Sequence, residues 1–231
     1  MKKQIPNLIT LGNLLCGVLA CYIAPLGYYK QAAALICAGI FLDFFDGMAA
    51  RLLKVPSEIG KQLDSLADVV TSGVAPGLIM MDILTHGRYD TFCYVALFIP
   101  LFAAYRLAKF NVDSRQSHSF RGLPAPANAM IWVGVALGGW KPCMAFGWQD
   151  ATVLFTIVAT CILMVSDISM FSLKFNFHDM RWRENRAQYI FLSVCAVIIA
   201  LTRSWYAISI IIGWYVALSI ATIKWTKESE Q

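Results

Sequence analysis

Charged residues are scarce in this sequence of 231 residues: Asp, Glu, Lys and Arg make up 14%, whereas hydrophobic residues make up 58%. A balance this apolar excludes an ordinary soluble domain and is typical of a polytopic membrane protein. The formal net charge is only +5. Most of it follows from where the loops lie relative to the membrane, and nothing in the sequence indicates a nucleic-acid partner.

Cysteine motifs are missing as well. The seven cysteines are scattered, odd in number and mostly inside apolar runs, and no CxxC pair occurs. They predict neither a disulfide framework nor a zinc site, and we interpret them as small packing residues. Internal repeats and polar stretches of domain size are also absent, so we expect a single integral-membrane catalytic domain over residues 1–231.

Eight apolar runs approach the roughly 17–25 residues that a transmembrane helix needs. They cover about 6–26, 31–53, 62–84, 91–110, 124–140, 151–171, 188–203 and 205–223. The last two are separated only by residues 202–204, so they form either one hairpin or a re-entrant pair. We interpret the first run as an uncleaved helix, because Leu15 before Cys16 is too large for a good signal-peptide cleavage site.

Basic residues predict the orientation. With the N-terminus in the cytoplasm, fifteen of the nineteen Lys and Arg residues fall on the cytoplasmic side and four on the other. This bias follows the positive-inside rule and supports an even number of spans. We therefore expect a multi-pass protein of the cell membrane with both termini in the cytoplasm and membrane lipids, including anionic headgroups, as partners.

Four aspartates interrupt the apolar pattern, two of them in the second run. Asp43, Asp46, Gly47 and Ala50 are spaced i, i+3, i+4, i+7, which places them on one stripe of a helix. The two small residues leave room for a ligand to approach the backbone beside the acids.

The third run repeats this pattern, because Gly60, Asp64 and Asp68 form an i, i+4, i+8 row. The short connection makes the two runs antiparallel neighbours, so we expect the acidic stripes to face each other. A carboxylate near the bilayer centre costs roughly 2.5–3.5 kcal/mol, so four together need a neutralising partner. Two divalent cations on the order of 3.5–4 Å apart would suit them, and Arg51 is well placed to meet a phosphate.

Other readings of buried acids exist. A lone intramembrane aspartate often serves helix packing or a proton relay, and a metal or proton transporter also lines its path with acids. Transporters typically carry repeats with broken helices in both halves. Here the acids occupy one pair of neighbouring runs and have no second copy, so we favour an enzyme site.

The pattern Asp43-x2-Asp46-Gly47-x2-Ala50-Arg51-x8-Gly60-x3-Asp64-x3-Asp68 resembles the signature of the CDP-alcohol phosphatidyltransferase family at all eight fixed positions. The resemblance implies an all-α fold: a polytopic six-helix membrane core, usually a homodimer, with a cytoplasm-facing cavity. This chain would add about two C-terminal helices.

The same resemblance implies the roles of the signature residues. Two Mg²⁺ or Mn²⁺ ions would bind the CDP diphosphate, held by Asp43, Asp46, Asp64 and Asp68, with Asp68 also the general base. The nucleotide would lie against Gly47, Ala50, Arg51 and Gly60. We add Asn7, Thr10 and Asn13 in the first run as candidate CDP contacts, although ordinary interfacial capping would also explain them.

Segments outside the signature are similar to the integral-membrane phosphatidylserine synthases of this family. They are IPNLITLGNLLCG at the N-terminus, RLAKFNV at 106–112, FRGLPAPANA at 120–129 and LMVSDISMFSLKF at 163–175. This resemblance implies transfer of the phosphatidyl group from CDP-diacylglycerol to L-serine with release of CMP. We therefore expect a core at about 1–175 and extra helices at about 188–223.

Four residues are candidates for binding serine: Arg106, Lys109, Asn111 and Arg121. Arginine can hold a carboxylate with two hydrogen bonds, although cations at these positions are also explained as positive-inside anchors. Glycerol 3-phosphate or an inositol-type alcohol as acceptor, and an archaeal ether lipid as donor, remain alternatives. No His-x-Lys-x4-Asp motif occurs, so we expect direct displacement without a covalent histidine intermediate.

Overall fold

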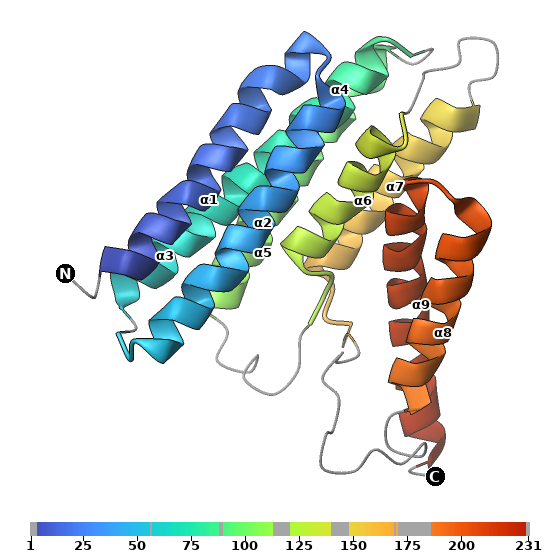
Figure 1. Ribbon diagram of the computed structural model, residues 1–231. Helices are drawn as coiled ribbons and strands as arrows, with labels where there is room; N and C mark the ends of the chain where they lie inside the picture. Colours follow the sequence, from blue (N-terminus) through green and yellow to red (C-terminus); the bar gives the residue numbers. More distant parts are fainter. Residues whose placement is uncertain are drawn as a thin grey trace.

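The computed structural model describes residues 4–55, 57–87, 90–112, 121–139, 148–168, 170 and 186–229. Within these ranges the chain is helical without a β-strand, which confirms the all-α prediction (Figure 1). Some residues used in the sequence-based predictions lie outside the described residues. They are Pro56, Cys143 and the basic residues of 1–3, 88–89, 113–120, 140–147 and 171–185, which were counted for orientation.

The helices follow one another with short connections. The first part of the chain forms α1 (Gln4–Ile23), α2 (Tyr29–Leu52), α3 (Glu58–Asp68), the π-helical turn η2 (Val69–Val74), α4 (Ala75–Thr85), η3 (Asp90–Leu97) and α5 (Phe98–Val112). The rest forms α6 (Ala125–Leu137), α7 (Trp148–Val165), α8 (Arg186–Thr202) and α9 (Tyr206–Ser229).

Four helical stretches have the length and apolarity to cross a membrane: Gln4–Leu26, Tyr29–Leu52, Glu58–Thr85 and Asp90–Val112. Helices α6 to α9 supply shorter apolar stretches over the described residues. All of them coincide with the predicted runs, and the protein is a helical membrane bundle. Two runs end earlier than predicted, α6 at Leu137 and α7 at Val165, and Gly139 follows α6 with a φ of 75° that favours glycine.

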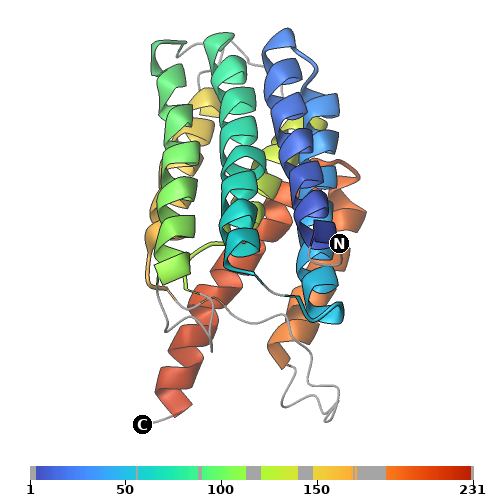
Figure 2. The same ribbon diagram turned by 90° about the vertical axis from the view of Figure 1, so that its left-hand side faces the viewer.

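The helices alternate in direction, so the start of α1, the end of α2 and the start of α3 meet at one end of the bundle (Figures 1 and 2). Helix α1 packs against both α2 and α3, and α6 packs against α2 and α9. Helices α8 and α9 form the hairpin that was one of the two predicted alternatives, with Arg203 at its turn. Its α9 is fixed to α6, where Ser209 Oγ donates to the carbonyl of Ile131 at 2.6 Å.

The third span is not a continuous α-helix. Its sequence GVAPG at 73–77, with two glycines and a proline, predicts a kink in this run, and the structure has a π-helical turn at Val69–Val74 just before α4. Pro76 has no N–H to donate, and the N–H of Ala75 bonds instead to the carbonyl of Val70, five residues back. A Cβ on Gly77 would lie 2.9 Å from Pro100 Cδ, so glycine lets α5 approach this span closely.

Candidate active site

Helices α2 and α3 bring the two acidic stripes together. Ser57 is the N-cap of α3, because its Oγ accepts from the N–H of Gly60 at 3.0 Å. One carboxylate oxygen each from Asp43, Asp64 and Asp68 lie within 4.8 Å of one another. The predicted convergence of the two stripes is therefore present in the fold.

The contacts within this group fit a bound cation. The carboxylate oxygens of Asp43 and Asp64 lie within 4.8 Å of each other, and two ionised carboxylates this close repel unless a shared proton or a cation lies between them. Oδ1 of Asp64 is buried and has no hydrogen-bond partner among the described residues. Clustered carboxylate oxygens are the ligands that hard divalent cations prefer, so the donor set suits a divalent metal.

Beside the acids lies a cavity of about 260 Å³ between α1, α2 and α3. Its lining includes most of the predicted nucleotide contacts: Asn7, Thr10, Gly47, Ala50, Arg51 and Gly60. Asp46 and Asp64 form its acidic side. Lys61 also lines the cavity and was not singled out from the sequence, although its place three residues before Asp64 puts it near the same stripe.

The two signature glycines differ in their surroundings. A Cβ on Gly47 would have no atom within 4 Å, so this glycine leaves open space at the cavity. A Cβ on Gly60 would lie 2.9 Å from Ser57 Oγ and 3.1 Å from Asn7 Oδ1. Gly60 therefore allows the start of α3 to close against α1.

Two side chains of helix α1 donate hydrogen bonds to two of the aspartates. Thr10 Oγ1 donates to Asp46 Oδ2, and Asn13 Nδ2 donates to Asp68 Oδ1 at 3.2 Å. Asn13 is fully buried and does not line the cavity as described. The structure thus places Thr10 at the cavity wall and Asn13 behind the acids, where it orients Asp68.

Of the predicted serine-binding residues, Arg106 lies deepest. Its side chain is 7% exposed, it interacts electrostatically with Asp68, and its Nε has no hydrogen-bond partner among the described residues. Arg121 also has a buried Nε without a partner in the described part of the chain. A buried, unpaired guanidinium nitrogen is costly unless an acceptor meets it.

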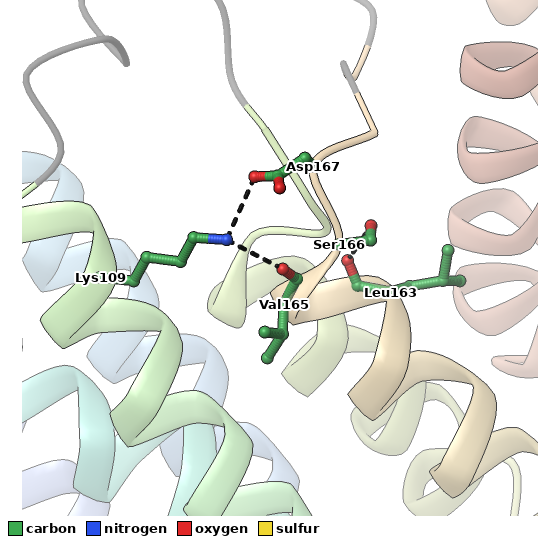
Figure 3. A network of polar contacts seen from close by, with 5 residues as sticks. All are labelled: Lys109, Leu163, Val165, Ser166 and Asp167. Carbon is green, nitrogen blue, oxygen red and sulfur yellow. Dashed lines mark hydrogen bonds and ion pairs between the residues drawn. The ribbon is translucent and has the colours of Figure 1, made fainter.

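Lys109 is engaged elsewhere. Figure 3 shows its side chain reaching from α5 to the turn after α7, where Nζ pairs with Asp167 at 3.1 Å and donates to the carbonyl of Val165 at 3.2 Å. Asn111 likewise donates through Nδ2 to Ser65 Oγ at 2.8 Å. These two side chains connect helices to one another, while Arg106 remains near the acids.

Two of the segments that resemble phosphatidylserine synthases, 120–129 and 163–175, contact each other through their described residues. The N–H of Gly122 donates to the carbonyl of Ile168 at 2.8 Å, and that of Leu123 donates to the carbonyl of Leu163 at 3.1 Å. Gly122 has a φ of 70° and a Cβ there would lie 2.9 Å from the Ser166 carbonyl oxygen. The 121–123 segment therefore packs directly on the end of α7, beside Arg106 and Lys109.

Comparison with known proteins agrees with this geometry. Residues 3–141 match the family described as CDP-alcohol phosphatidyltransferase. The chain is 40% identical over 131 residues to a CDP-diacylglycerol–serine O-phosphatidyltransferase of Bacillus subtilis, covering 57% of this chain and 74% of that protein. A protein of the same name from Helicobacter pylori is 32% identical over 222 residues, with 95% and 90% covered.

An archaeal protein is similar too. The archaetidylserine synthase of Methanothermobacter thermautotrophicus is 29% identical over 166 residues, which cover 71% of this chain and 68% of that protein.

Proposed function

This chain belongs to the CDP-alcohol phosphatidyltransferase family, and from that membership we propose that it transfers the phosphatidyl group of CDP-diacylglycerol to the hydroxyl of L-serine, releasing CMP. The names of its relatives support serine as the acceptor. The observation that carries the proposal is the position of Asp68, whose carboxylate belongs to the acidic cluster and also interacts electrostatically with the buried Arg106.

The donor would enter with its cytidine diphosphate in the cavity between α1, α2 and α3. Arg51 lines this cavity and offers charge to the phosphates. Lys61 lines it as well, and its Nζ also donates to the carbonyl of Asn111 at 3.3 Å. Gly47 leaves space for close approach. The acyl chains would remain in the membrane, because the cavity is lined by the ends of apolar helices.

The metal site would comprise Asp43, Asp46, Asp64 and Asp68, and we propose two Mg²⁺ or Mn²⁺ ions. Bound there, divalent cations would stabilise negative charge on the phosphoryl oxygens and on the leaving CMP. Thr10 and Asn13 would hold Asp46 and Asp68 in the orientation that binding requires.

Serine would lie between Asp68 and Arg106. Its carboxylate would accept hydrogen bonds from Arg106, and its hydroxyl would give its proton to Asp68. The serine oxygen then forms a bond to the lipid-bearing phosphorus while the bond to the CMP oxygen breaks. Because Lys109 and Asn111 already have partners, Arg106 is the principal candidate for the carboxylate and Arg121 the second.

Three broader features belong to the same proposal. The basic residues support an active site that faces the cytoplasm of a cell membrane, with both termini on that side. We treat residues 1–231 as one catalytic domain with its core at about 1–175 and helices at about 188–223 added. Family resemblance supports a homodimer, which cross-linking in native membranes would detect.

A panel of acceptors tests the function. Purified protein would be incubated with CDP-diacylglycerol or its ether-linked archaeal counterpart and with labelled serine, glycerol 3-phosphate or inositol phosphate. Lipid product and CMP would be measured together. We expect serine to label the lipid with equal release of CMP. Labelling by another alcohol, with serine inactive, would reject the acceptor; turnover of only the ether lipid would identify the donor that the archaeal relative's name indicates.

A further inference from the structure

A ring of hydrogen bonds ties α3 to the C-terminal end of α5. Asn111 Nδ2 donates to Ser65 Oγ at 2.8 Å, and Ser65 Oγ donates to the carbonyl of Lys61 at 3.2 Å. Lys61 Nζ donates in turn to the carbonyl of Asn111 at 3.3 Å. We call these three residues the Lys61–Ser65–Asn111 bridge.

The bridge lies between the two sides of the candidate active site. Ser65 directly follows Asp64 and stands three residues before Asp68. Asn111 stands on α5 five residues after Arg106. One end of the bridge is therefore on the helix of the acids and the other on the helix of the candidate carboxylate ligand.

The bridge acts beside a packed contact. Among the described residues, α3 packs mainly against α1, and η2, which continues the same span after Asp68, packs against α5. Direct contact of α3 itself with α5 is sparse, and the bridge supplies two hydrogen bonds to it, from Asn111 to Ser65 and from Lys61 to Asn111.

The chemistry at the helix end explains only part of the bridge. The carbonyl of Asn111 is among the last four of α5, which have no partner within the helix, and a lysine stabilises such an end. The Asn111 amide has no such need, since water could satisfy a half-buried side chain. Its contact with Ser65 instead fixes the end of α5 against α3.

We infer that Ser65 and Asn111 are positioning residues, which set the distance between Arg106 and the aspartates of α3, and that Asn111 does not itself contact serine. This inference rests on the proposed function. It replaces a direct role for Asn111 with one exerted through Ser65, a residue that the sequence pattern did not mark.

Positioning through the bridge and direct binding of serine by Asn111 predict different effects of Ser65→Ala. A positioning bridge is broken equally from either side, so Ser65→Ala, Asn111→Ala and the double variant should share one defect. If Asn111 bound serine directly, Ser65→Ala would leave serine kinetics unchanged. Ser65→Thr keeps the hydroxyl and should restore the bridge.

The experiment is a double-mutant cycle on the full-length protein in detergent. We expect each alanine variant and the double variant to raise the KM for serine by about three- to tenfold, the range that one lost hydrogen bond gives. The KM for CDP-diacylglycerol and the thermal shift on adding donor should stay at wild-type values. Ser193→Ala is the matched control, because Ser193 Oγ donates within α8, to the carbonyl of Tyr189 at 2.8 Å, and its helix carries none of the site residues.

Several results would overturn the inference. If Asn111→Ala raises the KM for serine and Ser65→Ala does not, Asn111 is a direct ligand of serine. If the effects of the two variants add in the double variant, the two residues act independently. If the alanine variants lack a donor-dependent thermal shift, Asn111→Leu, which keeps the branched shape of asparagine but has no polar side-chain atom, and Ser65→Thr replace them: the first should raise the KM for serine and the second should not. A wild type that does not use serine at all would instead reject the proposed function.

Discussion

Asn13 and Asp68 come from different helices, yet the amide of Asn13 donates directly to the carboxylate of Asp68 at 3.2 Å. The backbone carbonyl of Asn13 accepts from Thr71 Oγ1 at 3.1 Å, so Asn13 is held by the same span that carries Asp68. The orientation of the proposed base is therefore determined by α1 and not by its own helix alone.

Replacing Asn13 should accordingly impair catalysis more than donor binding. A hydrogen bond to a charged group contributes about 1.5–3 kcal/mol, so Asn13→Ala should lower kcat by about tenfold or more. The thermal shift on adding CDP-diacylglycerol should persist. Gln62→Ala, which removes an exposed amide from α3, is the control; equal kcat in Asn13→Ala and wild type would show that Asp68 needs no such support.

Removal of divalent metal should abolish activity, because carboxylates of Asp43, Asp64 and Asp68 converge within 4.8 Å and repel one another without a cation. Turnover would be followed after treatment with EDTA and then after separate additions of Mg²⁺ and Mn²⁺. We expect complete loss and recovery with at least one ion. Full turnover in excess chelator would contradict a metal-dependent reaction.

The four aspartates should differ in what they contribute. Asp68→Asn should lose turnover while retaining donor binding, because its proposed proton transfer concerns the acceptor. Asp43→Asn and Asp46→Asn should lose both, since they would hold the metals that hold the diphosphate. Thermal shift with CDP-diacylglycerol and metal separates the two effects. Equal loss of binding in all three variants would assign Asp68 to metal ligation only.

Arg106→Ala should impair serine use selectively. A charge-assisted hydrogen bond to a carboxylate contributes about 1.5–3 kcal/mol, so serine kcat/KM should fall by about tenfold or more with the KM for CDP-diacylglycerol nearly constant. The variant should also discriminate less against ethanolamine, which lacks the carboxylate. Lys30→Ala, which removes an exposed cation at the far end of α2, is the control. Wild-type serine kinetics in Arg106→Ala would reassign the residue as an anchor.

Close helix packing behind the acids should be sensitive to a single methyl group. A Cβ on Gly39 would lie 2.6 Å from Thr71 Cγ2 and 2.8 Å from Asn13 Oδ1, so Gly39→Ala must displace residues that support Asp68. We expect a lower Tm and lower activity. Gly213→Ala in α9 is the matched control, because a Cβ there has no atom within 4 Å; an unchanged Tm in both variants would contradict the packing.

The sequence predicted the elements of this fold and the core of the site from local spacing. Asp43 and Asp46 share a helix face because of the 3.6-residue repeat, and the short connection to Asp64 makes the two helices antiparallel. These relations need no knowledge of distant contacts.

Contacts between distant helices could not be predicted in the same way. Asn13 was expected to contact CDP, and the structure shows its amide donating to Asp68, 55 residues away. Helix periodicity does not specify which helices become neighbours. Lys109 was likewise expected to bind serine, and the structure pairs it with Asp167, 58 residues away. The predicted kink at GVAPG was located to within a turn, but proline alone does not determine that the irregularity is a π-helical turn.

The π-helical turn at Val69–Val74 makes the third span tolerant of a change in length at one place. A π turn holds one residue more than an α-helical turn, and one residue corresponds to about 100° of helix rotation. The π turn accommodates its extra residue locally, so deleting one residue there would restore an α-helical turn while Gly77 still faced Pro100 and Asp64 and Asp68 kept their phase. A single-residue change in length can therefore be absorbed at this turn without altering which face either half of the span presents to its neighbours.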